Sequence, residues 1–367
     1  MRLRIAAKRK RFNRFVYYEL FKRGEGMKIT FTADLHLSGF VSDLTDSVTD
    51  LPERLSEKKK VLYSIIEEMK KRGSEHLIIA GDLLHNKSVI YSLAQSVLLD
   101  FIRENKDIHF TLIDGNHDLS GKGRTIVSAL KCLDSESNVA RVQFNQVLKT
   151  EQFIFIPYSI NVVKQVRENS GNILVSHFGL NEAVLNCGAS IVSDVSLKDL
   201  VGRYKFAFLG HYHTPQEIIN EYIKLYYMGS ITQTDWSEKN ENKRFLVFDS
   251  ETGEVESILT KGYKKRYELL ITNENKEEVI KQARELKSNG DYVILKKTEK
   301  VETSDISKEF AIVDKTEKTL SSRGISMSMA DKDKVVRYLE VSEVPQEDRE
   351  WIANEALDIM QVCCGQV

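Results

Sequence analysis

The sequence is poor in cysteine and has no long apolar run. Its 367 residues include four cysteines, Cys132, Cys187, Cys363 and Cys364, and no CxxC pair. This spacing argues against a disulfide framework or a zinc ribbon and favours a reducing compartment. No apolar stretch approaches the roughly 20 residues that a membrane-spanning helix needs. We therefore expect a cytoplasmic chain with no membrane span.

Internal repeats and low-complexity tracts are also missing. Hydrophobic residues make up 41% and charged residues 29% of the chain, which is typical of a globular protein and argues against collagen-like, disordered or membrane classes. The length exceeds one average domain, so we expect a large catalytic domain with smaller appendages.

The charge is distributed unevenly. Residues 1–26 hold nine Lys or Arg and two Glu, a net charge of +7, which leaves −8 for residues 27–367. An acidic body is not the usual footprint of a nucleic-acid binder, so any DNA contact must come from local basic patches or from a partner. The basic extension lacks the apolar core of a secretory signal, and its arginines leave a transit peptide open. Because Met27 directly precedes the first strand-like run, we favour a natural start there.

From residue 27 to about 260, short β-rich apolar runs alternate with amphipathic helical patterns, which is typical of an α/β domain. Gly73 is expected to end the first helix. The expected strands are 28–33, 77–80, 108–113, 153–157, 173–176, 205–209, 222–228, 243–248 and 255–259, and the expected helices are 56–72 and 89–104.

The rest of the chain changes character. Residues 261–325 combine a strand (266–272), a Lys/Glu-rich helix (276–287), a second strand (292–297) and a polar stretch, which indicates a small α+β domain. Residues 326–367 carry two helical patterns, 332–338 and 346–361. Two isolated helices of this length cannot bury their apolar faces alone. These helices are expected to pack on the body or to dock on a partner.

Five short polar motifs follow directly after expected strands. Ligands of α/β folds sit at the carboxyl ends of strands, so these motifs can converge although 180 positions separate the first from the last. Each motif alone is compatible with turn or capping chemistry, but the whole series favours one metal site. The motifs are Asp34-Leu35-His36, Gly81-Asp82, Gly115-Asn116-His117-Asp118, Ser176-His177 and Gly210-His211-Tyr212-His213.

This set of side chains suits a pair of divalent ions that act on a phosphodiester. Asp82 is expected to bridge the two ions with its two carboxylate oxygens. Mixed imidazole and oxygen ligands favour Mn, Fe or Zn over Mg or Ca. We assign Asp34, His36 and His213 to the first ion, and Asn116, His177 and His211 to the second.

Other residues are assigned supporting roles. His117 is placed to protonate the leaving oxygen or to stabilise charge on the phosphate, and Asp118 to accept a hydrogen bond from a neighbouring imidazole. His85 is a candidate substrate contact, although a loop role is equally open. Gly229-Ser230 could offer backbone N–H groups to a phosphate, with a tight turn as the alternative. His76 and His109 are expected to be structural.

The order DxH, GD, GNHD, SH, GHxH resembles that of the calcineurin-like metallophosphoesterases. The segments GDLLH, DGNHD, GHYH and MGSITQTDWSE followed by KRFLVFD are most similar to SbcD-type nuclease subunits, including those of large phages. The resemblance implies a β-sandwich core flanked by helices over residues 27–260, a capping domain at 261–325 and a partner-binding helical segment at 326–367. The chain departs from the family pattern at Ser38 and in the polar loop 39–54.

The family resemblance also carries functional expectations. It implies that the seven residues assigned to the two ions are ligands, that His117 is the catalytic histidine and that the metal is manganese. The expected partners are DNA ends, an SbcC-type coiled-coil ATPase and a second copy of the chain, for which the sequence indicates no interface. The location would be the cytoplasm, that of the host if a phage encodes the chain. A stand-alone phosphatase or cyclic-nucleotide phosphodiesterase, and a scaffold with vestigial activity, remain as alternatives.

Overall fold

A computed structural model describes residues 26–39, 45–87, 89–184, 192–315 and 331–342, with residues 344–346, 349, 351 and 352. The described residues form two compact units, one made of those up to Tyr267 with Gly290–Tyr292, and the other of Glu268–Asn289 with those from Val293 onward. The predicted basic extension, up to residue 25, and most of the predicted helix 346–361 lie outside the described residues.

The first unit contains two six-stranded sheets. The first sheet has the order β14-β13-β1-β2-β3-β6. Its strands β1, β2, β3 and β6 run parallel, and β13 pairs antiparallel with β1 and β14. The strands are β1 (Lys28–Thr32), β2 (Ser74–Ala80), β3 (His109–Ile113), β6 (Val139–Val142), β13 (Arg244–Asp249) and β14 (Val255–Leu259).

The second sheet has the order β11-β12-β10-β9-β8-β7. Its four central strands are parallel, while β7 and β11 pair antiparallel at the two edges. The strands are β7 (Leu148–Lys149), β8 (Phe153–Ile156), β9 (Ile173–His177), β10 (Phe206–Gly210), β11 (Gln216–Ile219) and β12 (Lys224–Tyr227).

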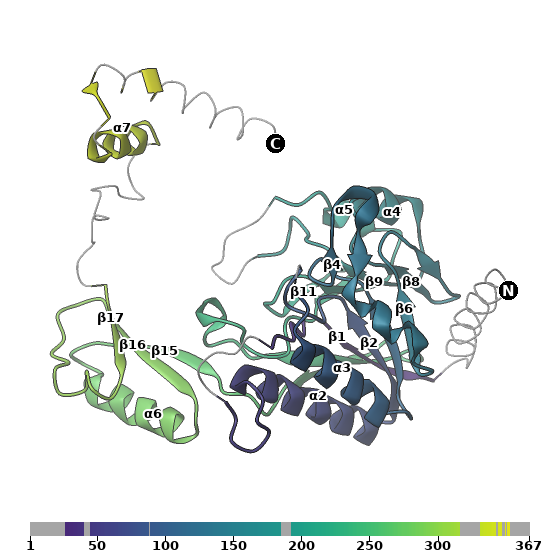
Figure 1. Ribbon diagram of the computed structural model, residues 1–367, viewed down its shortest axis with the longest axis horizontal. Coiled ribbons are helices and arrows are strands. Elements are labelled where there is room, and N and C mark those ends of the chain that lie inside the picture. Colours follow the sequence, from purple (N-terminus) through teal and green to yellow (C-terminus); the bar gives the residue numbers. More distant parts are fainter. Residues whose placement is uncertain are drawn as a thin grey trace. The chain divides into compact units, whose positions relative to one another are not determined.

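Three apolar cores hold these layers together. Between the sheets, Phe31 of β1 stacks on Phe208 of β10 with ring centroids 4.0 Å apart. On the outer face of the first sheet lie α2 (Glu53–Lys71) and α3 (Ser92–Glu104), and on that of the second lie α4 (Val162–Glu168) and α5 (Leu197–Leu200). Figure 1 shows these two helix pairs on opposite sides of the unit, which confirms the predicted β-sandwich flanked by helices.

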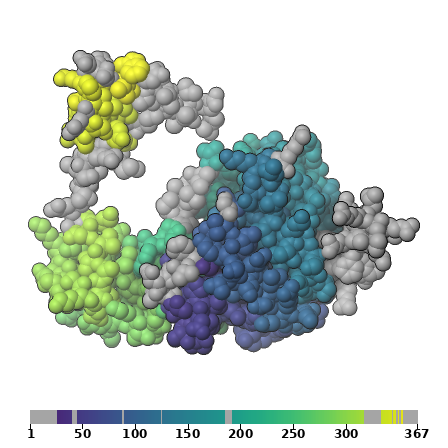
Figure 2. Space-filling model, viewed as in Figure 1, coloured from purple at the N-terminus to yellow at the C-terminus, as the bar shows by residue number. Residues whose placement is uncertain are grey.

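Helix α2 illustrates how the sequence produces these layers. Leu62, Ile65 and Met69 follow helical spacing and are buried against the first sheet, whereas Glu67 and Lys70 are exposed. The helix ends where Gly73 adopts the left-handed conformation with φ 74°, as predicted for this glycine. In Figure 2 the purple to teal part of the chain forms one continuous surface on the visible face of this unit.

The second unit contains a three-stranded sheet in the order β15-β16-β17 and helix α6 (Lys276–Ser288). Its strands are β15 (Arg266–Ile271), β16 (Tyr292–Lys297) and β17 (Ala311–Asp314), of which β17 falls in the stretch expected to be merely polar. Helix α7 spans Asp331–Val341. None of the described helices is long and apolar enough to cross a membrane.

Candidate metal centre

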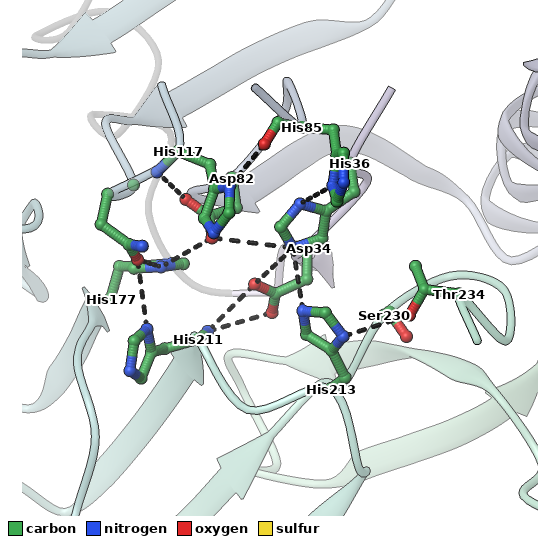
Figure 3. A network of polar contacts seen from close by, with 12 residues as sticks. Asp34, His36, Asp82, His85, His117, His177, His211, His213, Ser230 and Thr234 are labelled. Atoms are coloured by element: carbon green, nitrogen blue, oxygen red, sulfur yellow. Dashed lines mark hydrogen bonds and ion pairs between the residues drawn. The ribbon is translucent and has the colours of Figure 1, made fainter. Parts of the chain in front are cut away.

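The five polar motifs lie at one edge of the sandwich because they end strands that run in the same direction. In the first sheet Asp34, Asp82 and Asn116 follow the parallel strands β1, β2 and β3. In the second sheet His177 is the last residue of β9, and His211 follows its parallel neighbour β10. The two sheets thus contribute to one cluster, which Figure 3 shows from close by.

Close approach of the backbones at this edge requires glycine. A Cβ on Gly210 would lie 2.2 Å from the Ala80 carbonyl oxygen and 2.8 Å from Nδ1 of His177. A Cβ on Gly115 would lie 2.2 Å from Oδ1 of Asp82. Glycine at these two positions is therefore a steric requirement for bringing neighbouring strand ends together.

One group of side chains contains Asp34, His36 and His213, whose donor atoms all lie within 4.8 Å of one another. The Nε2 atoms of His36 and His213 are 2.8 Å apart, and Nε2 of His36 lies 4.0 Å from Oδ1 of Asp34. Asp34 is fully buried, and its carboxylate accepts hydrogen bonds from the backbone N–H of His211. These are the residues assigned to the first ion.

A second group surrounds Asn116. Its Oδ1 atom is 2.9 Å from Nε2 of His177 and 3.2 Å from Nδ1 of His211. Asp82 lies between the groups, because its Oδ2 is 3.7 Å from Nε2 of His36 and 3.4 Å from Nε2 of His177. The donors are imidazole nitrogens and carboxylate or amide oxygens, a set that fits two divalent transition-metal ions.

His117 is held at the rim of the cluster. Its backbone N–H donates to Oδ1 of Asp82, and its ring Nδ1 contacts the carbonyl oxygen of His85 at 2.5 Å. The rings of His85 and His117 stack with centroids 5.8 Å apart. The Nδ1 contact leaves Nε2 as the ring nitrogen of His117 that a substrate can meet.

The buried charges perturb one another. Burial raises the pKa of Asp34 to about 7 and, with the charge of His177, lowers the pKa of His211 to about 3. Burial alone would lower the pKa of His177, but the neighbouring Asp82 outweighs it and raises that pKa to about 9. Strongly shifted titratable groups gathered at one edge of a sheet are typical of a functional site.

With this geometry established, sequence comparison identifies the family. The model of the calcineurin-like phosphoesterase family matches residues 27–297. The chain belongs to this family. Membership confirms the predicted enzyme class, a metal-dependent phosphodiester hydrolase.

A curated relative supports the narrower resemblance to SbcD-type subunits. This calcineurin-like phosphoesterase is 25% identical over 312 residues to the SbcD subunit of the nuclease SbcCD of Staphylococcus epidermidis. The match covers 74% of this chain and 79% of that protein.

Two solved structures are also similar. One, from "Structural and Functional Characterization of a Novel Archaeal Phosphodiesterase", has a TM-score of 0.35 and 13% identity and covers 64% of this chain and 99% of that one. The other, purple acid phosphatase PPD1 of yellow lupin, has a TM-score of 0.40 and 12% identity and covers 66% and 53%. With TM-scores below 0.5, neither adds support for a particular substrate.

Asp118 and Ser230 of this phosphoesterase make hydrogen bonds other than those expected. Asp118 accepts hydrogen bonds from the backbone N–H groups of Leu84 and Gly115 rather than from an imidazole. The Ser230 N–H group donates to the His213 carbonyl, so it is not offered to a phosphate. Gly229 has a left-handed φ of 78°, and a Cβ at this position would meet the His213 carbonyl oxygen and the Pro215 ring. Each of these residues shapes the loops that carry the cluster.

Sequence reasoning missed a layer of buried charges behind the cluster. Lys58 of α2 donates to the His36 carbonyl at 2.6 Å, and Lys243 donates to the His213 carbonyl at 3.0 Å. Glu238 accepts from both His213 and Lys243. Glu238 and Lys243 fall within the segments that resemble SbcD-type subunits, but in sequence a buried acid and a surface acid look the same.

Proposed function

We propose that this phosphoesterase is the nuclease subunit of an SbcCD-type complex that processes DNA ends with two divalent ions, of which manganese is our choice. The observation that carries the proposal is the position of Asp82, whose Oδ2 lies within 3.7 Å of one histidine from each predicted ligand group. The family match supports phosphoester hydrolysis, and the relative supports a nuclease.

In this proposal the first ion is held by Asp34, His36 and His213 and the second by Asn116, His177 and His211, with Asp82 shared between them. Two divalent ions bound there would neutralise the charge of a phosphodiester and make water a nucleophile near neutral pH. The buried carboxylates of the cluster would help to retain the ions.

His117 would act as the catalytic histidine through Nε2. Because its Nδ1 is engaged by the His85 carbonyl, the ring can place a proton on Nε2 and direct it toward the leaving oxygen or a phosphate oxygen. His85, exposed beside it, would contact the substrate. Its imidazole lies 3.3 Å from Nδ1 of His36, so it also helps to orient that predicted ligand.

The remaining parts of the chain would serve the complex. We propose that residues 27–260 form the nuclease domain, that residues 261–325 cap it and that residues 326–367 bind a coiled-coil ATPase. The net charge of −8 over residues 27–367 supports a partner that supplies much of the grip on DNA. We further propose that the chain acts in DNA repair and recombination in the cytoplasm and that two copies of it form a homodimer.

The test incubates purified Met27–Val367 with Mn²⁺ and end-labelled duplex DNA, with EDTA and His117→Ala as controls and a small nucleotide diester in parallel. We expect metal-dependent cleavage of DNA that His117→Ala lowers by about 10²–10⁴-fold. Hydrolysis of the small diester alone, also in the presence of the ATPase partner, would favour a stand-alone phosphodiesterase. Absence of both activities would favour a scaffold.

A further inference from the structure

Behind His213 lies a buried carboxylate that none of the predicted metal or catalytic roles uses. Oε1 of Glu238 is 2.8 Å from Nδ1 of His213, and Glu238 is fully buried. In Figure 3 the His213 ring lies with one edge toward His36 and the other toward Thr234, and the hydroxyl of Thr234 is 3.2 Å from Nδ1 of His213. The Nδ1 edge of the ring therefore faces Glu238 and Thr234.

The Glu238 carboxylate is saturated with donors. Its Oε1 also accepts from the Thr234 hydroxyl. Its Oε2 accepts from the Ser230 hydroxyl at 3.0 Å, the Thr234 backbone N–H at 3.1 Å and the Lys243 ammonium at 2.7 Å. A buried charge is tolerated only when such partners replace water. The carboxylate is thus fixed in place and remains an acceptor.

An acceptor at this position determines where the neutral His213 ring carries its proton. The ring must hold hydrogen on Nδ1 to donate to Glu238, which leaves the lone pair on Nε2. That Nε2 atom lies 2.8 Å from Nε2 of His36, in the group that also contains Asp34.

We propose that Glu238 is a positioning residue that fixes the tautomer and the ring orientation of His213, so that Nε2 is presented to the first ion. This inference rests on the proposed function. Lys243 completes the arrangement, because it bonds both the Glu238 carboxylate and the His213 carbonyl. The Glu238–Lys243 ion pair thus holds His213 by its side chain and by its backbone. Carboxylate partners of this kind change metal affinity by about 10–100-fold.

The test is a titration of the metal-free full-length chain with Mn²⁺ alone, comparing wild type with Glu238→Gln. The glutamine keeps the side-chain volume but removes the charge that holds the proton on Nδ1, and Lys243 retains Glu241 at 2.6 Å as its ion-pair partner. We expect the wild type to bind two ions, and Glu238→Gln to bind one of them about 10–100-fold more weakly while the other is unchanged. The ring ¹⁵N shifts of His213 should move away from the Nδ1-protonated tautomer.

Glu241→Gln is the matched control, since Glu241 also pairs with Lys243 but has no contact with His213 among the described hydrogen bonds. It should bind both ions as the wild type does. If Glu238→Gln fails to fold, Glu238→Met with Lys243→Met removes both buried charges and should show the same selective weakening. Unchanged binding of both ions in the Glu238 variants, or equal weakening of both, would overturn the inference. A wild type that binds no Mn²⁺ would instead overturn the proposed dinuclear function.

Discussion

Four residues of the candidate metal centre adopt left-handed backbone conformations that most side chains avoid. Their φ angles are 53° at Asp34, 46° at His36, 53° at Asp82 and 97° at His211. Each such residue costs of order 1–3 kcal/mol and persists only where the surrounding structure enforces it. Here the parallel ladders and the tight glycine contacts enforce it, so the strain lies where the predicted ligands must leave their strands.

At the residue scale, His117 and Asp82 should separate catalysis from metal binding. We expect His117→Ala to retain both ions, because the backbone N–H that bonds Asp82 is kept in the variant. Asp82→Ala should lose metal, since it removes the oxygen shared by the two histidine groups. Metal analysis of the purified variants measures this. A depleted site in His117→Ala would make that residue a ligand.

His76 should contribute to the dependence of stability on pH. It is buried on β2 beside His109, and burial followed by the charge of His109 lowers its pKa to about 3. In the unfolded chain the pKa of His76 has its ordinary value near 6.5. Between about pH 3 and pH 6.5 the unfolded chain therefore binds more protons than the folded chain. The free energy of unfolding must therefore fall as the pH drops from about 6.5 toward 3.

The measurement is urea unfolding of wild type and His76→Gln at several pH values. We expect the wild type to lose stability more steeply than the variant below pH 6.5, by up to about 1.4 kcal/mol per pH unit. Parallel curves for the two proteins would show that His76 does not titrate in this window.

At the scale of elements, the close approach of the strand ends can be tested with two glycines. Gly210→Ala places a Cβ against the Ala80 carbonyl and the His177 ring, so we expect a loss of about 1–3 kcal/mol in unfolding free energy and weaker Mn²⁺ binding. Gly73→Ala is the contrast, because a Cβ there meets nothing within 4 Å and only the positive φ is strained. It should cost about 1–2 kcal/mol and leave metal binding unchanged. Equal metal affinity in both variants would contradict the steric argument.

Some of the strands could be predicted from the sequence and others could not. Buried parallel strands such as β1, β2 and β10 are continuous apolar runs and were predicted to within a few residues. Strand β6 was missed because Arg141 interrupts its apolar pattern, and only the structure shows that this arginine is buried against Asp114. Strand β11 was missed because it is a half-exposed edge strand with polar residues.

The candidate site was predictable for a related reason. Its motifs follow strands whose direction and adjacency are implied by an α/β pattern, so their convergence could be expected. The partners behind them could not, since Glu238 and Lys243 are recognisable as an ion pair only when both are seen to be buried. The helix 89–104 also begins later than expected, at Ser92, because Val89 and Ile90 are exposed rather than part of its apolar face.

At the scale of the whole molecule, deletion of residues 326–367 should separate the proposed functions of the chain. We expect the shortened chain to keep Mn²⁺-dependent cleavage, because every residue of the cluster lies in the first unit. It should lose binding to the coiled-coil ATPase, which co-purification measures. Tyr338 and Val341 of α7 are exposed apolar residues that such a partner could cover. A complex that survives the deletion would contradict the role proposed for the tail.

The position of β1 has a consequence for synthesis on the ribosome. This strand lies between β2 and β13, and Lys28 pairs with Asp249. At about 5–20 residues per second, the intervening chain takes roughly 10–45 s to emerge. During that interval β1 has an unpaired edge, and its apolar residues Ile29 and Phe31 lack part of their final core. The predicted metal ligands could therefore not come together as one site before translation of the domain was nearly complete.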